Sequence, residues 1–128
     1  MSYIYYNPNP DQDDIDVDCT IRGISKLFNL TWDEAYIMSA VAGYIYKKMP
    51  VSNKCWPRLL DDLGLVRREV PNTCPNCITV KDFAGMHPRG RFLVGTGSHV
   101  VAIVNGDYYD SWDSGDETPI YYWEYQGG

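Results

Sequence analysis

The sequence predicts an α+β domain in which N-terminal helices pack on a C-terminal antiparallel β-sheet. Three observations support this prediction. Apolar residues recur at helical spacing between residues 19 and 62. Short segments rich in β-branched and aromatic residues, divided by Gly, Asn or Pro, dominate after residue 88. Helices that precede strands along a chain are typical of an α+β fold.

The length of the chain, 128 residues, fits one domain that buries roughly two thirds of its unfolded surface. We therefore expect a single domain over residues 1–128. Residues 1–18 are polar and turn-rich, which predicts an extended arm before the first helix. A helical part is expected over residues 19–64 and a mainly β part over residues 65–125.

Three helices are expected in the helical part. Residues 19–28 carry an apolar stripe at helical spacing, and Asp18 or Asp16 would cap this helix. The second helix begins with a capping box at residues 31–34 and continues to about residue 47. The third is expected over residues 53–62, with a glycine at its C-terminal end.

The β part begins with a short strand over residues 65–70 and a short helix over residues 79–84. Four further strands are expected, each bounded by turn-forming residues. Their ranges are 91–96, 99–104, 107–111 and 120–125.

Three residues with catalytic chemistry fall at the ends of these elements. Cys19 begins the first helix, His99 begins a strand, and Asp110 lies on the next strand. A cysteine becomes a nucleophile when a histidine can take its proton and a third group orients the imidazole. The three residues therefore indicate a cysteine hydrolase or transferase site.

The turn between the two strands decides which carboxylate faces His99. Asn-Gly at positions 105–106 is a strong signal for a two-residue type I′ hairpin. In that register the two-residue period of strands places His99, Asp110 and Trp112 on one face. A three-residue loop would shift the pairing and present Asp113 instead. We favour Asp110.

The charges around Cys19 act in opposite directions. A helix N-terminus stabilises a thiolate, whereas Asp16 and Asp18 raise the pKa of a neighbouring thiol. Taken singly, each residue has a structural interpretation: a small buried Cys19, a hydrogen-bonded His99 and a surface Asp110. The combination in matching helix and strand contexts favours the catalytic interpretation.

Two short motifs carry a resemblance to a known family. The strand Gly-Ser-His-Val-Val-Ala-Ile-Val at 97–104 and the triplet Asp-Ser-Trp at 110–112 resemble motifs of the papain-like cysteine protease superfamily, in particular its minimal bacterial and phage branches. The resemblance implies a papain-like fold and thiolate attack on an amide carbonyl. It also implies a peptidase or isopeptidase that acts on a peptide or protein substrate without a cofactor.

The same resemblance implies an oxyanion-hole donor in the arm before the cysteine. Gln12, Asn7 and Asn9 carry side-chain amides that could act together with the backbone N–H of Cys19. Two further residues are substrate-site candidates. Gly97 would let a substrate backbone approach the histidine, and Trp112 would shield the His–Asp pair from water.

Two other functions remain open. The first is a non-enzymatic phage- or prophage-type protein that uses the papain-like cleft to bind or inhibit a host partner. The second is an amide or acyl transferase, which would pass the acyl group to an acceptor other than water.

Composition bears on partners and location. The net charge of −6 argues against nucleic acid, whose phosphates need clustered Lys and Arg. The sequence holds neither an apolar run long enough to span a membrane nor a signal-peptide pattern, so we expect no membrane partner and a cytoplasmic location.

In a reducing cytoplasm the four cysteines would be thiols. Cys74 and Cys77 have the spacing of half a zinc site, for which only Cys55 and His87 remain as further ligands. The spacing favours two exposed thiols, or a transient disulfide, over a metal site.

Overall fold

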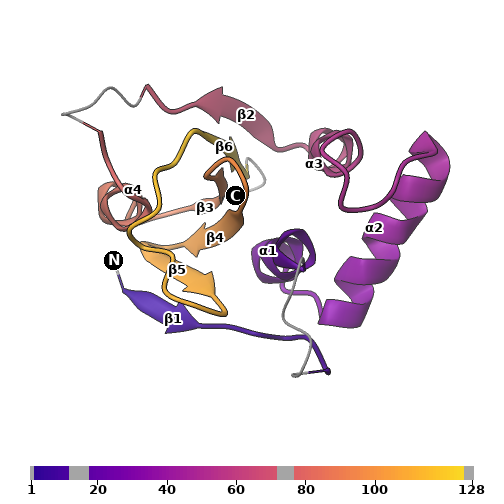
Figure 1. Ribbon diagram of the computed structural model, residues 1–128, viewed down its shortest axis with the longest axis horizontal. Coiled ribbons are helices and arrows are strands. Elements are labelled where there is room, and N and C mark those ends of the chain that lie inside the picture. Colours follow the sequence, from indigo (N-terminus) through magenta and orange to yellow (C-terminus); the bar gives the residue numbers. More distant parts are fainter. Residues whose placement is uncertain (1, 12–17, 72–76, 126–128) are drawn as a thin grey trace.

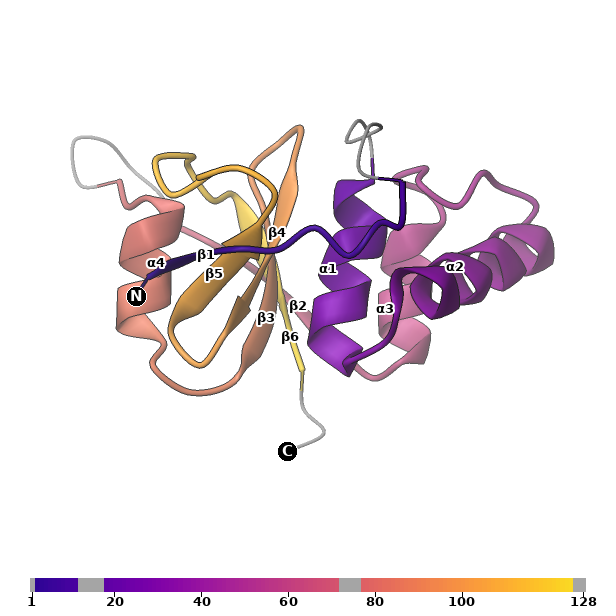
Figure 2. The same ribbon diagram turned by 90° about the horizontal axis from the view of Figure 1, so that it is seen from below.

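The computed structural model describes residues 2–11, 18–71 and 77–125, and within them the chain forms an α+β fold of four helices and one six-stranded sheet. Helices α1, α2 and α3 lie on one side of the sheet, and α4 lies on the other (Figures 1 and 2). The helices are α1 (Cys19–Phe28), α2 (Trp32–Tyr46), α3 (Trp56–Asp62) and α4 (Val80–Met86). The strands are β1 (Tyr3–Tyr5), β2 (Val66–Glu69), β3 (Arg91–Gly95), β4 (Val100–Val104), β5 (Asp107–Asp110) and β6 (Tyr121–Glu124).

The strand order is β1-β5-β4-β3-β6-β2. The expected antiparallel sheet is confirmed for β2 to β6 but wrong for β1, which pairs with β5 in parallel. The extended arm therefore contains an edge strand. Its backbone is satisfied by the outer edge of β5, through pairs such as Tyr5 with Asp110. The sheet is mixed rather than antiparallel.

Helix α1 occupies the centre of the fold, between the sheet and α2 (Figure 2). Its apolar stripe is buried, and Ile24 and Leu27 have no exposed surface. Gly23 allows the helix to approach β3 closely, because a Cβ atom there would lie 2.5 Å from Cδ1 of Leu93. This packing fixes the N-terminal end of α1, and hence Cys19, against the sheet.

Helix α2 packs mainly through its small residues, and several of its large apolar side chains are exposed, namely Tyr36, Ile37, Val41, Tyr44 and Ile45. The buried positions are Ala35, Ser39, Ala42 and Gly43. The capping box between Thr31 and Glu34 is present as expected. In the described residues, no helix is both long and apolar enough to cross a membrane.

The β4–β5 hairpin has the predicted register. Asn105 and Gly106 both adopt positive φ, at 50° and 85°, as a type I′ turn requires. Val104 pairs with Asp107, and Ala102 pairs with Tyr109. The same register brings the start of β4 beside the end of β5, at the end of the sheet where α1 begins.

Candidate active site

Three element ends meet at one place. Cys19 is the first residue of α1, His99 immediately precedes β4, and Asp110 is the last residue of β5. The central packing of α1 against β4 brings the helix N-terminus to the strand ends. The structure thus brings together the three residues that the sequence proposes as a catalytic set.

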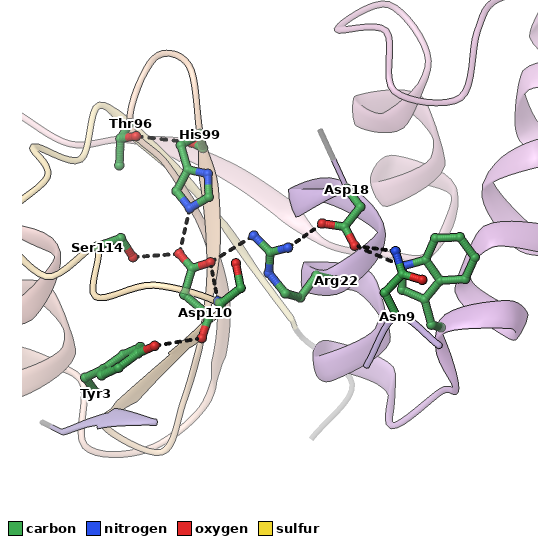
Figure 3. A network of polar contacts seen from close by, with 10 residues as sticks. Tyr3, Asn9, Asp18, Arg22, Thr96, His99, Asp110 and Ser114 are labelled. Atoms are coloured by element: carbon green, nitrogen blue, oxygen red, sulfur yellow. Dashed lines mark hydrogen bonds and ion pairs between the residues drawn. The ribbon is translucent and has the colours of Figure 1, made fainter. Parts of the chain in front are cut away.

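His99 and Asp110 form a short hydrogen bond, 2.6 Å between Nε2 and Oδ2 (Figure 3). The Asp110 side chain has no exposed surface, and that of His99 is 11% exposed. Burial disfavours the charged imidazolium, but the hydrogen bonds and negative charges of Asp110 and Cys19 raise the pKa of His99 to about 9. His99 is therefore an imidazolium at neutral pH.

The thiol of Cys19 is half-buried and lies beside the side chain of His99 and the backbone of Val100. Burial raises the pKa of this thiol. These two neighbours and the positive charges of His99 and Arg22 outweigh burial and lower the pKa below its ordinary value. The combination of a lowered thiol pKa and a raised imidazole pKa favours a thiolate–imidazolium pair.

Every oxygen of Asp110 has at least two hydrogen-bond donors. Oδ2 accepts from His99 and from the hydroxyl of Ser114 at 2.7 Å. Oδ1 accepts from Nη2 of Arg22 at 2.9 Å and from the backbone N–H of Ser111 at 2.8 Å. Burial raises the pKa of Asp110, but these hydrogen bonds and the cations His99 and Arg22 lower it overall. The carboxylate is thereby held ionised and in one orientation.

Arg22 joins Asp110 to Asp18 (Figure 3). Its guanidinium is buried and forms ion pairs with both carboxylates. Asp18 also accepts hydrogen bonds from Nδ2 of Asn9 at 3.3 Å and from Nε1 of Trp32 at 3.1 Å. The expected effect of Asp18 on the thiol is therefore offset by neighbouring donors. Asp16 lies outside the described residues.

Asp18 does not act as a side-chain cap of α1, contrary to expectation. The reason is that its carboxylate is turned toward Arg22, Asn9 and Trp32 instead. The first backbone N–H groups of a helix have no acceptor within the helix. The Asp18 carboxylate therefore does not occupy the N–H groups of the first turn of α1, which lie near Cys19.

Asp113, the alternative third member, faces elsewhere. Its Oδ1 accepts a hydrogen bond from the Tyr108 hydroxyl at 2.7 Å and from the Gly115 backbone at 3.0 Å. These contacts lower the pKa of Asp113. The two-residue turn is the physical reason, because it presents Asp110 rather than Asp113 to His99.

The thiol opens into a cleft of about 230 Å³. Gly97 lies on its wall, as expected, beside His99. Trp112 is not among the lining residues, but its ring lies 4.9 Å from that of His99, centroid to centroid. The full lining comprises Cys19, Thr20, Val51, Asn53, Trp56, Gly97, Ser98, His99, Val100 and Tyr121.

The structure does not place any of the three amide candidates for the oxyanion hole, as far as it describes them, on the wall of the cleft. Gln12 lies outside the described residues. Asn7 and Asn9 are not among the residues that line the cleft, and Nδ2 of Asn9 is directed to Asp18. Asn53, which the sequence did not suggest, does line it. Its Oδ1 accepts from Nε1 of Trp56 at 3.0 Å, so its Nδ2 group remains as a donor.

The sequence reasoning also missed Arg22 and Ser114. Arg22 could have been found, because it follows Asp18 by one helical turn, the spacing at which opposite charges pair on a helix that carries a buried apolar stripe. A buried arginine in that setting needs acidic partners. Ser114 lies in a loop, where no periodic signal marks it.

No metal site is visible in the described part of the chain, which lacks any group of three or more His, Cys, Asp or Glu side chains suited to a metal. Cys74 lies outside the described residues. Cys77 is disulfide-bonded, so the expectation of four free thiols is wrong for this residue. Cys55 is a buried free thiol, and Nδ1 of His87 lies 2.8 Å from the carbonyl oxygen of Phe83.

The fold and site together define an α+β protein with a Cys–His–Asp constellation at the wall of a cleft. Comparison with known proteins found no matching family model, no matching curated protein and no matching solved structure.

Proposed function

We propose that the protein is a cysteine-dependent hydrolase of papain-like type that cleaves peptide or isopeptide bonds. The observation that carries this proposal is the juxtaposition of three residues: Asp110 is hydrogen-bonded to His99, and His99 lowers the pKa of the Cys19 thiol beside it. Asp110 occupies Nε2 of the imidazole, which leaves Nδ1 for the thiol. A histidine held at one nitrogen by a carboxylate and facing a thiol at the other is the arrangement of an activated cysteine.

The reaction would proceed in two stages. The Cys19 thiolate attacks the carbonyl carbon, and backbone N–H groups at the start of α1 stabilise the oxyanion of the tetrahedral intermediate. The His99 imidazolium then gives its proton to the leaving amine, which departs and leaves a thioester. In the second stage neutral His99 takes a proton from water, the resulting hydroxide adds to the thioester, and the acid and the free thiolate are released.

Exposed backbone beside His99 supports a peptide as the substrate. Gly97 and Ser98 are exposed beside His99 and offer backbone groups to an extended chain. Trp56 donates to Oδ1 of Asn53, so the Nδ2 group of Asn53 can donate to a substrate carbonyl. An amine in place of water would make the same thioester the intermediate of an acyl transfer.

Alkylation by iodoacetamide across pH, followed by mass spectrometry of each cysteine, tests the proposal. Cys19 should react rapidly below about pH 8, where an ordinary thiol with a pKa of about 8.5 is mostly protonated. Cys55 is an internal control, because burial raises its pKa. His99→Ala should remove the rapid reaction. An ordinary thiol profile at Cys19 would contradict the proposal.

A further inference from the structure

The cleft continues beyond the thiol into a second chamber. This chamber has a volume of about 350 Å³ and is lined by Asn53, Trp56, Pro57, Arg67, Gly97, Tyr121 and Trp123. Four of these residues also line the chamber that contains Cys19, namely Asn53, Trp56, Gly97 and Tyr121. The two chambers therefore share a wall, and an extended ligand can occupy both.

The charge of this surface differs from that of the protein. The net charge of the chain is −6, yet no Asp or Glu is among the described residues that line either chamber. The charged groups on these walls are Arg67 in the second chamber and, in the first, the Cys19–His99 pair, whose opposite charges offset each other. The second chamber is therefore lined by a cation, which favours an anionic group of a ligand.

The guanidinium of Arg67 is held over the cleft by an aromatic ring. Its Cζ lies 4.6 Å from the centroid of Tyr121, a cation–π distance. Its other partner is Glu69, at 2.5 Å between Nη1 and Oε1, with both side chains well exposed. An exposed ion pair of this kind contributes little to stability, so a ligand carboxylate can replace Glu69 at small cost.

We propose that the second chamber is a subsite for an acidic side chain of the substrate, with Arg67 as the residue that recognises its carboxylate. A guanidinium presents a planar pair of N–H donors that matches a carboxylate. The inference rests on the proposed function, because Cys19 supplies the reacting end of the cleft. The substrate class is then a peptide or protein segment with Asp or Glu a short distance from the cleaved bond.

The test uses matched tripeptide chloromethyl ketones, which alkylate an active-site thiol. Three pairs carry Glu or Gln at the first, second or third residue from the ketone and Gly elsewhere, so that each pair differs only in charge. At one position the Glu probe should inactivate Cys19 about fivefold faster than the Gln probe, the order expected for one partly exposed ion pair. Arg67→Gln should reduce this ratio to about one.

Arg68→Gln is the matched control. This substitution removes the same charge from the residue next to Arg67 in β2. Arg68 pairs with Glu124 and lines neither chamber. The Glu-to-Gln ratio should survive in this variant. A ratio near one at every position in the natural sequence overturns the subsite, as does an equal loss of the ratio in both variants.

A binding measurement separates the subsite from the proposed chemistry. Cys19→Ala protein is titrated with the two free tripeptide acids of each pair, and binding is measured by the change in tryptophan fluorescence. If no chloromethyl ketone labels Cys19, the proposed function fails. The subsite is still supported if a Glu peptide binds more tightly than its Gln counterpart and if Arg67→Gln, but not Arg68→Gln, removes this difference. Equal binding of Glu and Gln peptides, or no binding of either, overturns it.

Discussion

Nη2 of Arg22 lies 2.9 Å from Oδ1 of Asp110, and both side chains are buried behind the thiol. Replacing Arg22 with Met keeps most of the side-chain volume but leaves two carboxylates, Asp18 and Asp110, without their shared cation. The loss of one partner of a buried ion pair costs about 3–5 kcal/mol. Urea denaturation of Arg22→Met should show a decrease of this order in the free energy of unfolding.

Arg22→Lys keeps the charge and loses the two-sided geometry of the guanidinium. It should therefore fall between Arg22→Met and the natural sequence in stability. If Arg22→Met were as stable as the natural protein, the ion pairs with Asp18 and Asp110 would not hold in solution.

Asp110→Asn is expected to lower the pKa of His99, because the imidazolium loses its charged partner. A less stable imidazolium stabilises the Cys19 thiolate less, so the pH profile of Cys19 alkylation should move to higher pH. Asp113→Asn is the matched control, since Asp113 contacts Tyr108 and Gly115 instead. An equal displacement of the profile in both variants would contradict the assignment of Asp110.

His99 should also make stability depend on pH in a defined window. Its pKa in the folded state, about 9, lies above the ordinary value of 6.5. A group with a raised pKa stabilises the fold fully below its unfolded pKa and loses this contribution as pH rises through the folded pKa. The stabilisation by His99 should therefore be present at pH 6 and decline toward pH 9.

The measurement compares Cys19→Ala with the double variant Cys19→Ala/His99→Gln, so that the thiol does not titrate. Cys19 contributes to the raised pKa of His99, so in this background the decline should end below pH 9. Their difference in free energy of unfolding should fall by roughly 1–3 kcal/mol across the window. A difference that rises with pH would mean that burial, not Asp110, controls the imidazole.

Gly95 should be sensitive to the smallest substitution. A Cβ atom there would lie 2.3 Å from Cζ of Tyr121, which is closer than real contacts allow. Gly95→Ala should destabilise the protein by about 1–3 kcal/mol through this clash. In the background Tyr121→Ala the same substitution should cost much less, so a double-mutant cycle by urea denaturation should show strong coupling. Additive effects would mean that the ring does not occupy this position.

The residues that sequence reasoning placed correctly are those that local rules determine. The Asn-Gly turn and the two-residue strand period were sufficient to bring Asp110, rather than Asp113, to His99. The apolar stripe of α1 likewise predicted the buried helix that carries Cys19. These inferences need only the spacing of neighbouring residues.

The features that it missed depend on contacts between distant segments. The parallel pairing of β1 with β5 rests on three residues, too few for a periodic signal. Trp56 and Tyr121 lie on α3 and β6, and only the tertiary packing brings them to the wall of the cleft. Two partners of Asp18, Asn9 and Trp32, were unpredictable for the same reason, because they approach it from separate segments.

The pairing of β1 with β5 has a consequence for the order in which the protein assembles. The backbone N–H of Tyr6 and the hydroxyl of Tyr3 both donate to the carbonyl oxygen of Asp110. These segments are separated by more than one hundred residues, so β1 cannot pair until β5 has been synthesised. The carboxylate that orients His99 arrives with that late strand. In a nascent chain that lacks β4 and β5, neither His99 nor Val100 lies beside the Cys19 thiol, so the lowering of its pKa begins only when these strands join the sheet.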